Sequence, residues 1–132
     1  MRRETNRQRR GFLHLAALAP AGLALNGLPL AARAATAGDA KLKIGIVGSG
    51  NVGGALGRVW AKAGHQVMFS SRNIEHDREL AATTGSNARA GTPREAAAFG
   101  DVVMVSVPYR SLPAVGKDLA GLLEGKVVID TC

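Results

Sequence analysis

The sequence predicts a doubly wound α/β domain with five parallel strands in the order 3-2-1-4-5 and helices on both faces of the sheet. Two observations carry this prediction. Short apolar runs rich in β-branched residues recur along the chain, and segments with helical periodicity separate them. Because strands that alternate with helices form right-handed βαβ units, we expect a parallel sheet that binds its ligand at the carboxyl ends of the strands.

The first strand is expected at 41–47 ("KLKIGIV"), a run bounded by glycine that suits a central strand buried on both faces. A helix should follow, with an apolar stripe that faces the sheet. The stripe consists of Val52, Ala55, Leu56, Val59, Trp60 and Ala63. Gly64 ends this helix, and a second strand is expected at 65–70.

The remaining elements follow in the same alternation. A short helix is expected at 77–84, closed by Gly85, and a short third strand at 87–90. Thr92, Pro93 and Glu95 supply the cap, the first-turn proline and the capping-box glutamate of a helix at 93–99. The last three elements are a fourth strand at 101–107, a helix at 111–123 and a fifth strand at 126–130.

The positive charge of the chain, +7 in all, is concentrated at its beginning. Residues 1–34 contain six Arg and one acidic residue, a net charge of +5, whereas residues 35–132 carry only +2. A nearly neutral domain lacks the basic surface that a nucleic-acid partner requires. We therefore expect a small-molecule partner and no nucleic acid.

Residues 1–34 have the layout of a secretory signal: a basic section, an apolar run, and small residues that end in an A-x-A site at Ala34. The stretch "RRGFL" at 9–13 resembles the twin-arginine motif of Tat signals. An uncleaved anchor is the alternative, but prolines, a histidine and an asparagine interrupt the run. We expect a periplasmic or exported protein without a stable membrane span after cleavage, a linker at 35–40 and a domain at 41–132.

Gly48, Gly50 and Gly53 form G-x-G-x-x-G between a predicted strand and a predicted helix, the arrangement of a Rossmann dinucleotide-binding turn. The first glycine allows the tight turn, the second allows a pyrophosphate to approach, and the third allows helix and strand to pack closely. The helix N-terminus offers unpaired N–H groups to the phosphates. The alternative is a tight turn in a flavodoxin-like or unrelated α/β domain.

The end of the second predicted strand indicates which dinucleotide binds. A carboxylate there would accept the 2′-OH of NAD and repel a 2′-phosphate, but the stretch "FSSR" at 69–72 has none. Ser70 and Ser71 can donate to phosphate oxygens, and Arg72 offers a planar fork of donors. The sequence thus favours NADP(H); a solvated loop charge is the alternative role for Arg72.

With "KIGIVGSGNVGGALG", "FSSR" and "VSVP" in place, residues 41–132 resemble the N-terminal domain of the NADPH-dependent coenzyme F-420 oxidoreductases, which is shared more loosely with pyrroline-5-carboxylate reductases. The resemblance implies three groups of contacts: Ser49, Gly50, Asn51 and Val52 with the pyrophosphate; Ser71 and Arg72 with the 2′-phosphate; and Ser106, Val107 and Pro108 with the nicotinamide ribose and ring. Members of the family can carry a further basic residue where this chain has His76, and Arg78 is a possible substitute for it.

The resemblance implies the nucleotide-binding half of an NADPH-dependent oxidoreductase that transfers hydride between NADP(H) and a deazaflavin- or flavin-like acceptor, with F-420 as a candidate second substrate. It assigns no catalytic residue, and the sequence indicates no metal site. A non-catalytic NADP-binding module and an imine reductase are the alternatives. Because the resembling enzymes continue beyond the fifth strand, we expect this Rossmann domain to be truncated at its C-terminus and any homodimer to form through the missing region.

Overall fold

The structure is a computed structural model that describes residues 40–132. The predicted twin-arginine signal and nearly all of the predicted linker lie outside the described residues and stay predictions. Within residues 40–132, no helix is both long and apolar enough to cross a membrane.

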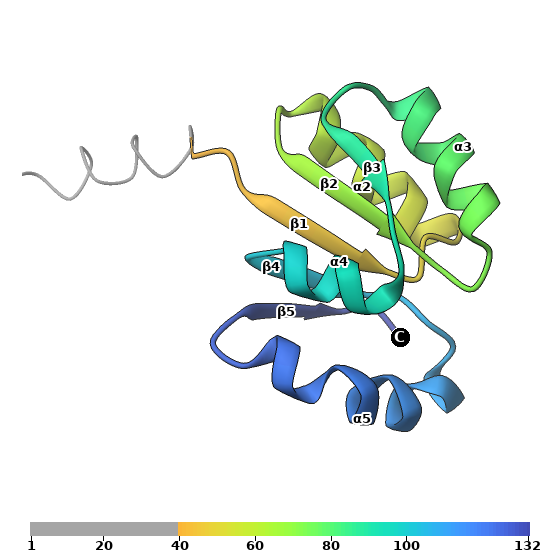
Figure 1. Ribbon diagram of the computed structural model, residues 1–132, viewed down its shortest axis with the longest axis vertical. Helices are drawn as coiled ribbons and strands as arrows, with labels where there is room; N and C mark the ends of the chain where they lie inside the picture. The colour runs from red at the N-terminus through yellow and green to blue at the C-terminus, as the bar shows by residue number, and fades with distance from the viewer. Residues whose placement is uncertain (1–39) are drawn as a thin grey trace, which may run out of the picture.

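Five parallel strands form one sheet in the order β3-β2-β1-β4-β5, which confirms the predicted doubly wound topology (Figure 1). The strands are β1 (Lys43–Val47), β2 (Gln66–Ser70), β3 (Ala88–Ala90), β4 (Val102–Val105) and β5 (Val127–Asp130). From β1 the chain adds β2 and β3 on one side of the sheet and β4 and β5 on the other. The loops that leave β1 and β4 therefore run in opposite directions. A crevice at the carboxyl ends of β1 and β4 is the expected place for a ligand.

Four helices and a short 3-10 turn connect the strands. They are α2 (Asn51–Lys62), α3 (Ile74–Thr84), α4 (Pro93–Phe99), η1 (Tyr109–Ser111) and α5 (Leu112–Leu123). One core cluster joins Ile46, Phe69 and Leu80 beneath α2 and α3, and a second joins Val47 and Leu119 beneath α4 and α5. Helices therefore cover both faces of the sheet.

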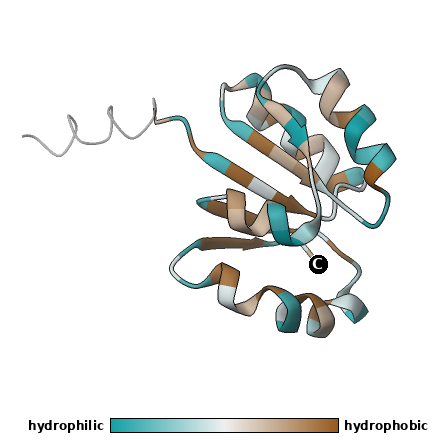
Figure 2. Ribbon diagram, in the orientation of Figure 1, coloured by the Kyte–Doolittle hydropathy of each residue, from teal (hydrophilic) through white to brown (hydrophobic). Residues whose placement is uncertain are grey.

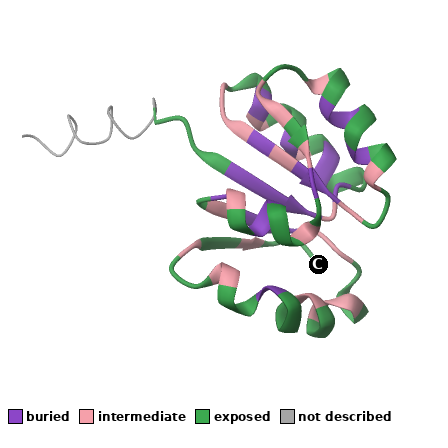
Figure 3. Ribbon diagram, in the orientation of Figure 1, coloured by how far each residue is buried: buried purple, intermediate pink, exposed green. Residues whose placement is uncertain are grey.

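The sheet is apolar and well covered at its centre. Apolar residues concentrate along the strands (Figure 2), and four of the five residues of β1 are buried (Figure 3). At the edge, β5 is largely exposed, with Val127 at 62% of its full accessibility. The carboxyl end of β1 is thus enclosed by the core, whereas β5 contributes less to it.

The face by which α2 packs differs from the prediction. The expected apolar stripe includes Val52 and Val59, but these side chains are 50% and 59% exposed. The residues that are buried in α2 are instead small: Gly53, Gly54, Gly57 and Ala61. The helix lies so close to the sheet that a Cβ at Gly57 would be 2.3 Å from the Phe69 ring. Close backbone approach determines the fully buried face, and of the predicted stripe Leu56 and Trp60 are half-buried against the core.

Several element boundaries also differ from the prediction, among them the start of β1 at Lys43 and not at residue 41. Helix α3 begins at Ile74 and not at residue 77, because the Asn73 side chain accepts a hydrogen bond from the His76 N–H and caps the helix three residues earlier. Strand β4 ends at Val105 and not at 107. The earlier start of α3 places Asp77 inside its first turn.

The predicted capping box at the start of α4 is present. Thr92 Oγ1 accepts from the Glu95 N–H (3.2 Å), and Glu95 Oε2 accepts from the Thr92 N–H (2.7 Å). The bond from the Thr92 backbone lowers the pKa of Glu95 below its ordinary value. A carboxyl group with a lowered pKa contributes stability that is present above its unfolded-state pKa and is lost as the pH falls through the folded-state value.

We predict that Glu95→Gln removes this pH dependence. Glutamine also fits a capping box, so the helix start is kept while the titrating group is lost. The difference in the free energy of unfolding between the wild type and the variant should narrow on acidification from near pH 7 to about pH 3. Denaturant unfolding at the two pH values measures it; a constant difference would contradict the prediction.

Candidate dinucleotide-binding site

The first glycine of the motif forms a tight turn between two strand ends. Gly48 has a φ of 102°, a conformation that residues with a Cβ rarely adopt. The N–H groups of Gly48 and Ser49 both donate to the Ser70 carbonyl, at 2.8 and 3.0 Å. A Cβ at Gly48 would lie 2.1 Å from the Ser106 carbonyl oxygen. The turn is therefore fixed between the carboxyl ends of β2 and β4.

The other two glycines have different surroundings. A Cβ at Gly53 would lie 2.1 Å from the Gly48 carbonyl oxygen, so the contact between helix and turn requires glycine. Gly50 is exposed, and a Cβ there would meet no atom within 4 Å. No atom of the described residues excludes a side chain at Gly50. The space in front of it is open to a ligand.

Helix α2 begins beside this space. Gly50 is its N-cap residue, no side chain caps the helix, and its first turn contains no acidic residue. The unpaired N–H groups and the partial positive charge of a helix N-terminus favour an anion. Asn51 and Val52, predicted to lie against a pyrophosphate, are exposed in this turn. The turn suits a diphosphate that approaches Gly50.

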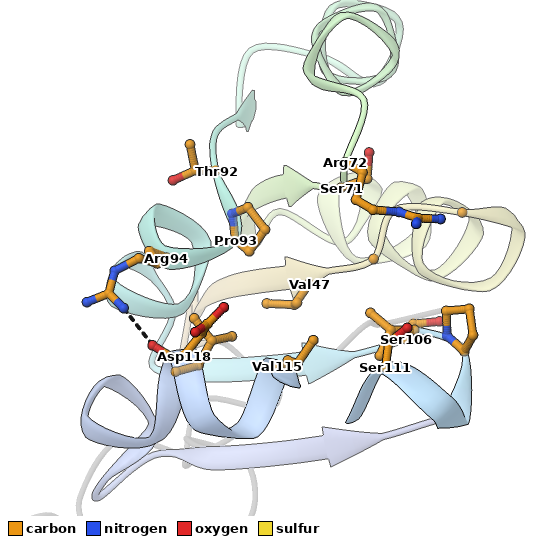
Figure 4. Close-up of a pocket in the computed structure, with 15 residues that line it drawn as sticks. Val47, Ser71, Arg72, Thr92, Pro93, Arg94, Ser106, Ser111, Val115 and Asp118 are labelled. Atoms are coloured by element: carbon orange, nitrogen blue, oxygen red, sulfur yellow. Dashed lines mark hydrogen bonds between the residues drawn. The ribbon is translucent and has the colours of Figure 1, made fainter. Parts of the chain in front are cut away.

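A cleft with a volume of about 590 Å³ opens next to the glycine turn (Figure 4). The loops after β1, β2, β3 and β4 and one face of α5 contribute its lining. In Figure 4, Ser71 and Arg72 lie on one side of the opening, with Ser106 and Ser111 on the other. The Arg94 guanidinium donates to the Asp118 carbonyl (2.6 Å), which links α4 to α5 at the far end.

The structure brings together many, though not all, of the predicted site residues. Those that line the cleft are Gly48, Gly50, Ser71, Arg72, Ser106, Val107 and Pro108. At the β4 end, the Ser106 N–H donates to the Val47 carbonyl (2.8 Å), so the loop that should border the nicotinamide is tied to β1. The Cys132 thiol accepts from the Val107 N–H at 3.4 Å behind this loop.

Arg72 lies at the rim of the cleft with an exposed side chain. Among residues 40–132, no acidic side chain forms an ion pair with it. Arg78, the other arginine considered for the 2′-phosphate, forms an ion pair with Glu75 on the surface of α3. His76, at the position of the further basic residue in the family, is exposed. Within residues 40–132, Arg72 is therefore a cation of this cleft without a carboxylate partner, and it can meet an anionic ligand there.

The serines at the site have other partners than we expected. Ser70 is fully buried, and its hydroxyl donates to the Ile46 carbonyl (2.6 Å), so this geometry does not support its predicted contact with a phosphate. Ser49 is also buried and its hydroxyl donates to Asp77, which leaves only its backbone for a pyrophosphate. The Ser71 hydroxyl donates to the same Asp77 carboxylate (2.9 Å).

Asp77 is one of the residues that the sequence analysis missed, together with cleft-lining residues such as Arg94, Ser111 and Val115. The Asp77 side chain is completely buried, and it accepts hydrogen bonds from the glycine turn and from the loop after β2. The sequence feature that could have indicated Asp77 is the helix cap at Asn73. Because α3 starts at Ile74, its first turn brings Asp77 beneath Ser49 and Ser71. Among the described residues, no cluster of three or more His, Cys, Asp or Glu could hold a metal ion.

Comparison with known families agrees with this geometry. The model of a family described as "NADP oxidoreductase coenzyme F420-dependent" matches residues 43–132, from the start of β1 to the last residue. The chain belongs to this family. Relatives of this NADP oxidoreductase family member include a glycerol-3-phosphate dehydrogenase (NAD(P)+) of Staphylococcus epidermidis, 30% identical over a 96-residue alignment that covers 64% of this chain and 29% of that protein.

Solved structures share the fold of the F420-dependent NADP oxidoreductase domain. An F420-dependent NADP-reductase from Arthrobacter sp. FB24 has a TM-score of 0.60 at 21% identity, over 67% of this chain and 44% of that one. A Mycobacterium tuberculosis 3-hydroxyisobutyrate dehydrogenase has a TM-score of 0.59 at 26% identity, over 69% and 31%. An imine reductase variant from Myxococcus stipitatus, solved with NAD+, has a TM-score of 0.60 at 22% identity, over 69% and 32%. The chain spans less than half the length of these relatives.

The residues of this NADP oxidoreductase family member fit a nicotinamide dinucleotide. The turn has space for a pyrophosphate at Gly50, the N-terminus of α2 favours its charge, and Arg72 lies beside the same cleft. Val115 and Leu119 of α5 supply apolar surface to the lining. Nicotinamide-nucleotide binding is also the property that the family supports.

Proposed function

We propose that this domain binds NADP(H) in the cleft and presents the nicotinamide for hydride transfer to a deazaflavin- or flavin-like acceptor. The single observation that carries the proposal is a combination of three features at one opening: the absence of a side chain at Gly50, the uncapped start of α2, and Arg72 without an ion pair within residues 40–132. A diphosphate and a 2′-phosphate need these two kinds of donor at neighbouring places.

Each part of the site has a separate task in this proposal. The backbone of the glycine turn and of α2 binds the pyrophosphate, and Arg72 binds the 2′-phosphate. The Ser106–Pro108 loop, held to β1 by the Ser106 N–H, orients the nicotinamide ribose and ring. When bound, the nicotinamide supplies the hydride, so the protein contributes position and electrostatics, and no acid–base pair is required in this domain.

The acceptor is the finer part of the proposal. A deazaflavin is suggested by the name of the family that matches residues 43–132. An imine acceptor is the second candidate, because an imine reductase is among the proteins that share the fold. A module that binds NADP without catalysis is the third. These relatives are longer than the part that they share with this chain.

Titration of the full chain with NADPH and NADH, followed by enhancement of nucleotide fluorescence, tests the binding step. We expect saturable binding of both, tighter for NADPH. Oxidation of NADPH with F-420, a flavin or a cyclic imine then tests the acceptor. Turnover with F-420 or a flavin supports the proposal, turnover with the imine alone favours the second candidate, and binding without turnover favours the third. Absence of binding by either nucleotide rejects the proposal.

A further inference from the structure

A buried carboxylate lies directly behind the 2′-phosphate subsite. Asp77 has no exposed surface, and its two oxygens accept one hydroxyl each: Oδ1 from Ser49, and Oδ2 from Ser71 at 2.9 Å. Two hydrogen bonds and a place in the first turn of α3 provide the compensation that a buried acidic group needs. The group joins the glycine turn to the loop that carries Arg72.

The contact with Asp77 decides what Ser71 can offer a ligand. A serine hydroxyl has one proton, and two acceptors within the protein lie in reach of that of Ser71: Asp77 Oδ2 at 2.9 Å and, less closely, the Asn73 carbonyl oxygen at 3.3 Å. One lone pair of the same oxygen accepts from the Asn73 N–H (3.0 Å), which leaves a second lone pair. Ser71 is half-buried and lines the cleft. Towards a ligand it therefore acts as a hydrogen-bond acceptor and not as a donor.

A hydrogen-bond acceptor at the position of Ser71 Oγ distinguishes NAD(H) from NADP(H). The 2′-OH of NAD(H) can donate to Ser71 Oγ, whereas the 2′-phosphate of NADP(H) presents acceptor oxygens and gains nothing from it. The carboxylate behind Ser71 adds a negative charge on the same side, which opposes a phosphate. Arg72 favours the phosphate from the rim. The two side chains therefore act in opposite directions on the 2′ substituent.

We propose that Asp77 is a specificity-determining residue: acting through Ser71, it reduces the preference for NADP(H) that Arg72 creates, so that the site also accepts NAD(H). The acidic group that often follows the second strand in NAD-binding domains is absent from 70–72, and Asp77 performs a weaker form of its task from beneath the loop. This inference rests on the proposed binding of nicotinamide dinucleotides in the cleft.

Replacing Asp77 by asparagine tests the inference. The amide keeps the size of the side chain, removes the negative charge, and can donate to Ser71 Oγ, which frees the Ser71 proton for a phosphate. We expect the ratio of the NADH to the NADPH dissociation constant to rise about tenfold, the effect of one hydrogen bond to a charged group. Adding Ser71→Ala to Asp77→Asn should remove part of this gain.

A matched control is Glu79→Gln, which removes a carboxylate from an exposed position of α3 that forms no ion pair within residues 40–132. This variant should leave the ratio unchanged. General loss of packing would weaken both nucleotides alike, so the ratio separates specificity from stability. If the ratio of the NADH to the NADPH dissociation constant stays constant or falls in Asp77→Asn, the inference is overturned while the proposed function stays intact.

Ser71→Ala alone keeps the inference testable even if Asp77→Asn does not fold. Loss of the hydrogen-bond acceptor at Ser71 should weaken the binding of NADH by several-fold and change the binding of NADPH little. A larger loss for NADPH would show that Ser71 donates to the phosphate, and would overturn the role given to Asp77. Failure of the wild-type chain to bind either nucleotide would instead reject the proposed function, and this inference with it.

Discussion

Replacement of Gly50 by alanine is expected to remove dinucleotide binding and to leave the fold unchanged. The backbone φ of Gly50 is −71°, which alanine adopts freely, and its Cβ would meet no protein atom within 4 Å. In the complex, the same methyl group would occupy the space through which a pyrophosphate reaches the N–H groups of α2. Loss of about two charge-assisted bonds weakens binding by roughly a hundredfold or more.

The measurements are the NADPH dissociation constant and the thermal unfolding temperature of the same preparations. Gly53→Ala is the contrasting variant, because its Cβ would lie 2.1 Å from the Gly48 carbonyl oxygen. That variant should lose stability as well as binding. If Gly50→Ala bound NADPH as tightly as the wild type, the pyrophosphate could not lie over Gly50, and the assignment of the glycine turn would be wrong.

The contrast between these two glycines shows what the motif alone conveys. G-x-G-x-x-G between a strand and a helix indicates the kind of site, because the spacing reflects backbone geometry that many sequences share. The three glycines look alike in the sequence. The structure separates Gly48 and Gly53, which the protein's own atoms require, from Gly50, where only a ligand would require the absence of a side chain.

The strand order was predictable for a related reason. Alternating strands and helices with right-handed crossovers permit few topologies, and the observed order is the expected one. The buried face of α2 was not predictable from hydrophobic periodicity. That rule assumes that large apolar side chains fill the contact with the sheet. In α2 the fully buried contact is made at glycines and an alanine, Leu56 and Trp60 are only half-buried against the core, and Val59 stays exposed.

The serines illustrate a second limit of sequence reasoning. Residue type shows that Ser49, Ser70 and Ser71 can each donate a hydrogen bond, but not to which acceptor. The acceptors are a carbonyl of β1 for Ser70 and the Asp77 carboxylate for the other two, at sequence separations of 24, 28 and 6 residues. Such partners depend on tertiary packing. Arg72 is different, because a long cation after a strand end reaches the rim whatever lies beneath it.

Arg72→Ala is accordingly expected to weaken NADPH binding by about ten- to a hundredfold and to change NADH binding little. A hydrogen bond to a charged group contributes about 1.5 to 3 kcal/mol, and this range corresponds to that loss of affinity. Because Arg72 is exposed and forms no ion pair within residues 40–132, its removal leaves no unpaired acidic partner behind. The unfolding temperature should therefore stay close to that of the wild type.

The matched control for Arg72→Ala is Arg58→Ala, which removes an exposed arginine from α2 outside the cleft. It should leave both dissociation constants unchanged. Raising the salt concentration should reduce the wild-type preference for NADPH but not that of Arg72→Ala, since an exposed charge pair is screened. Equal losses of NADPH and NADH affinity in Arg72→Ala would mean that the guanidinium contacts a part that the two nucleotides share, and the 2′-phosphate would then need another partner.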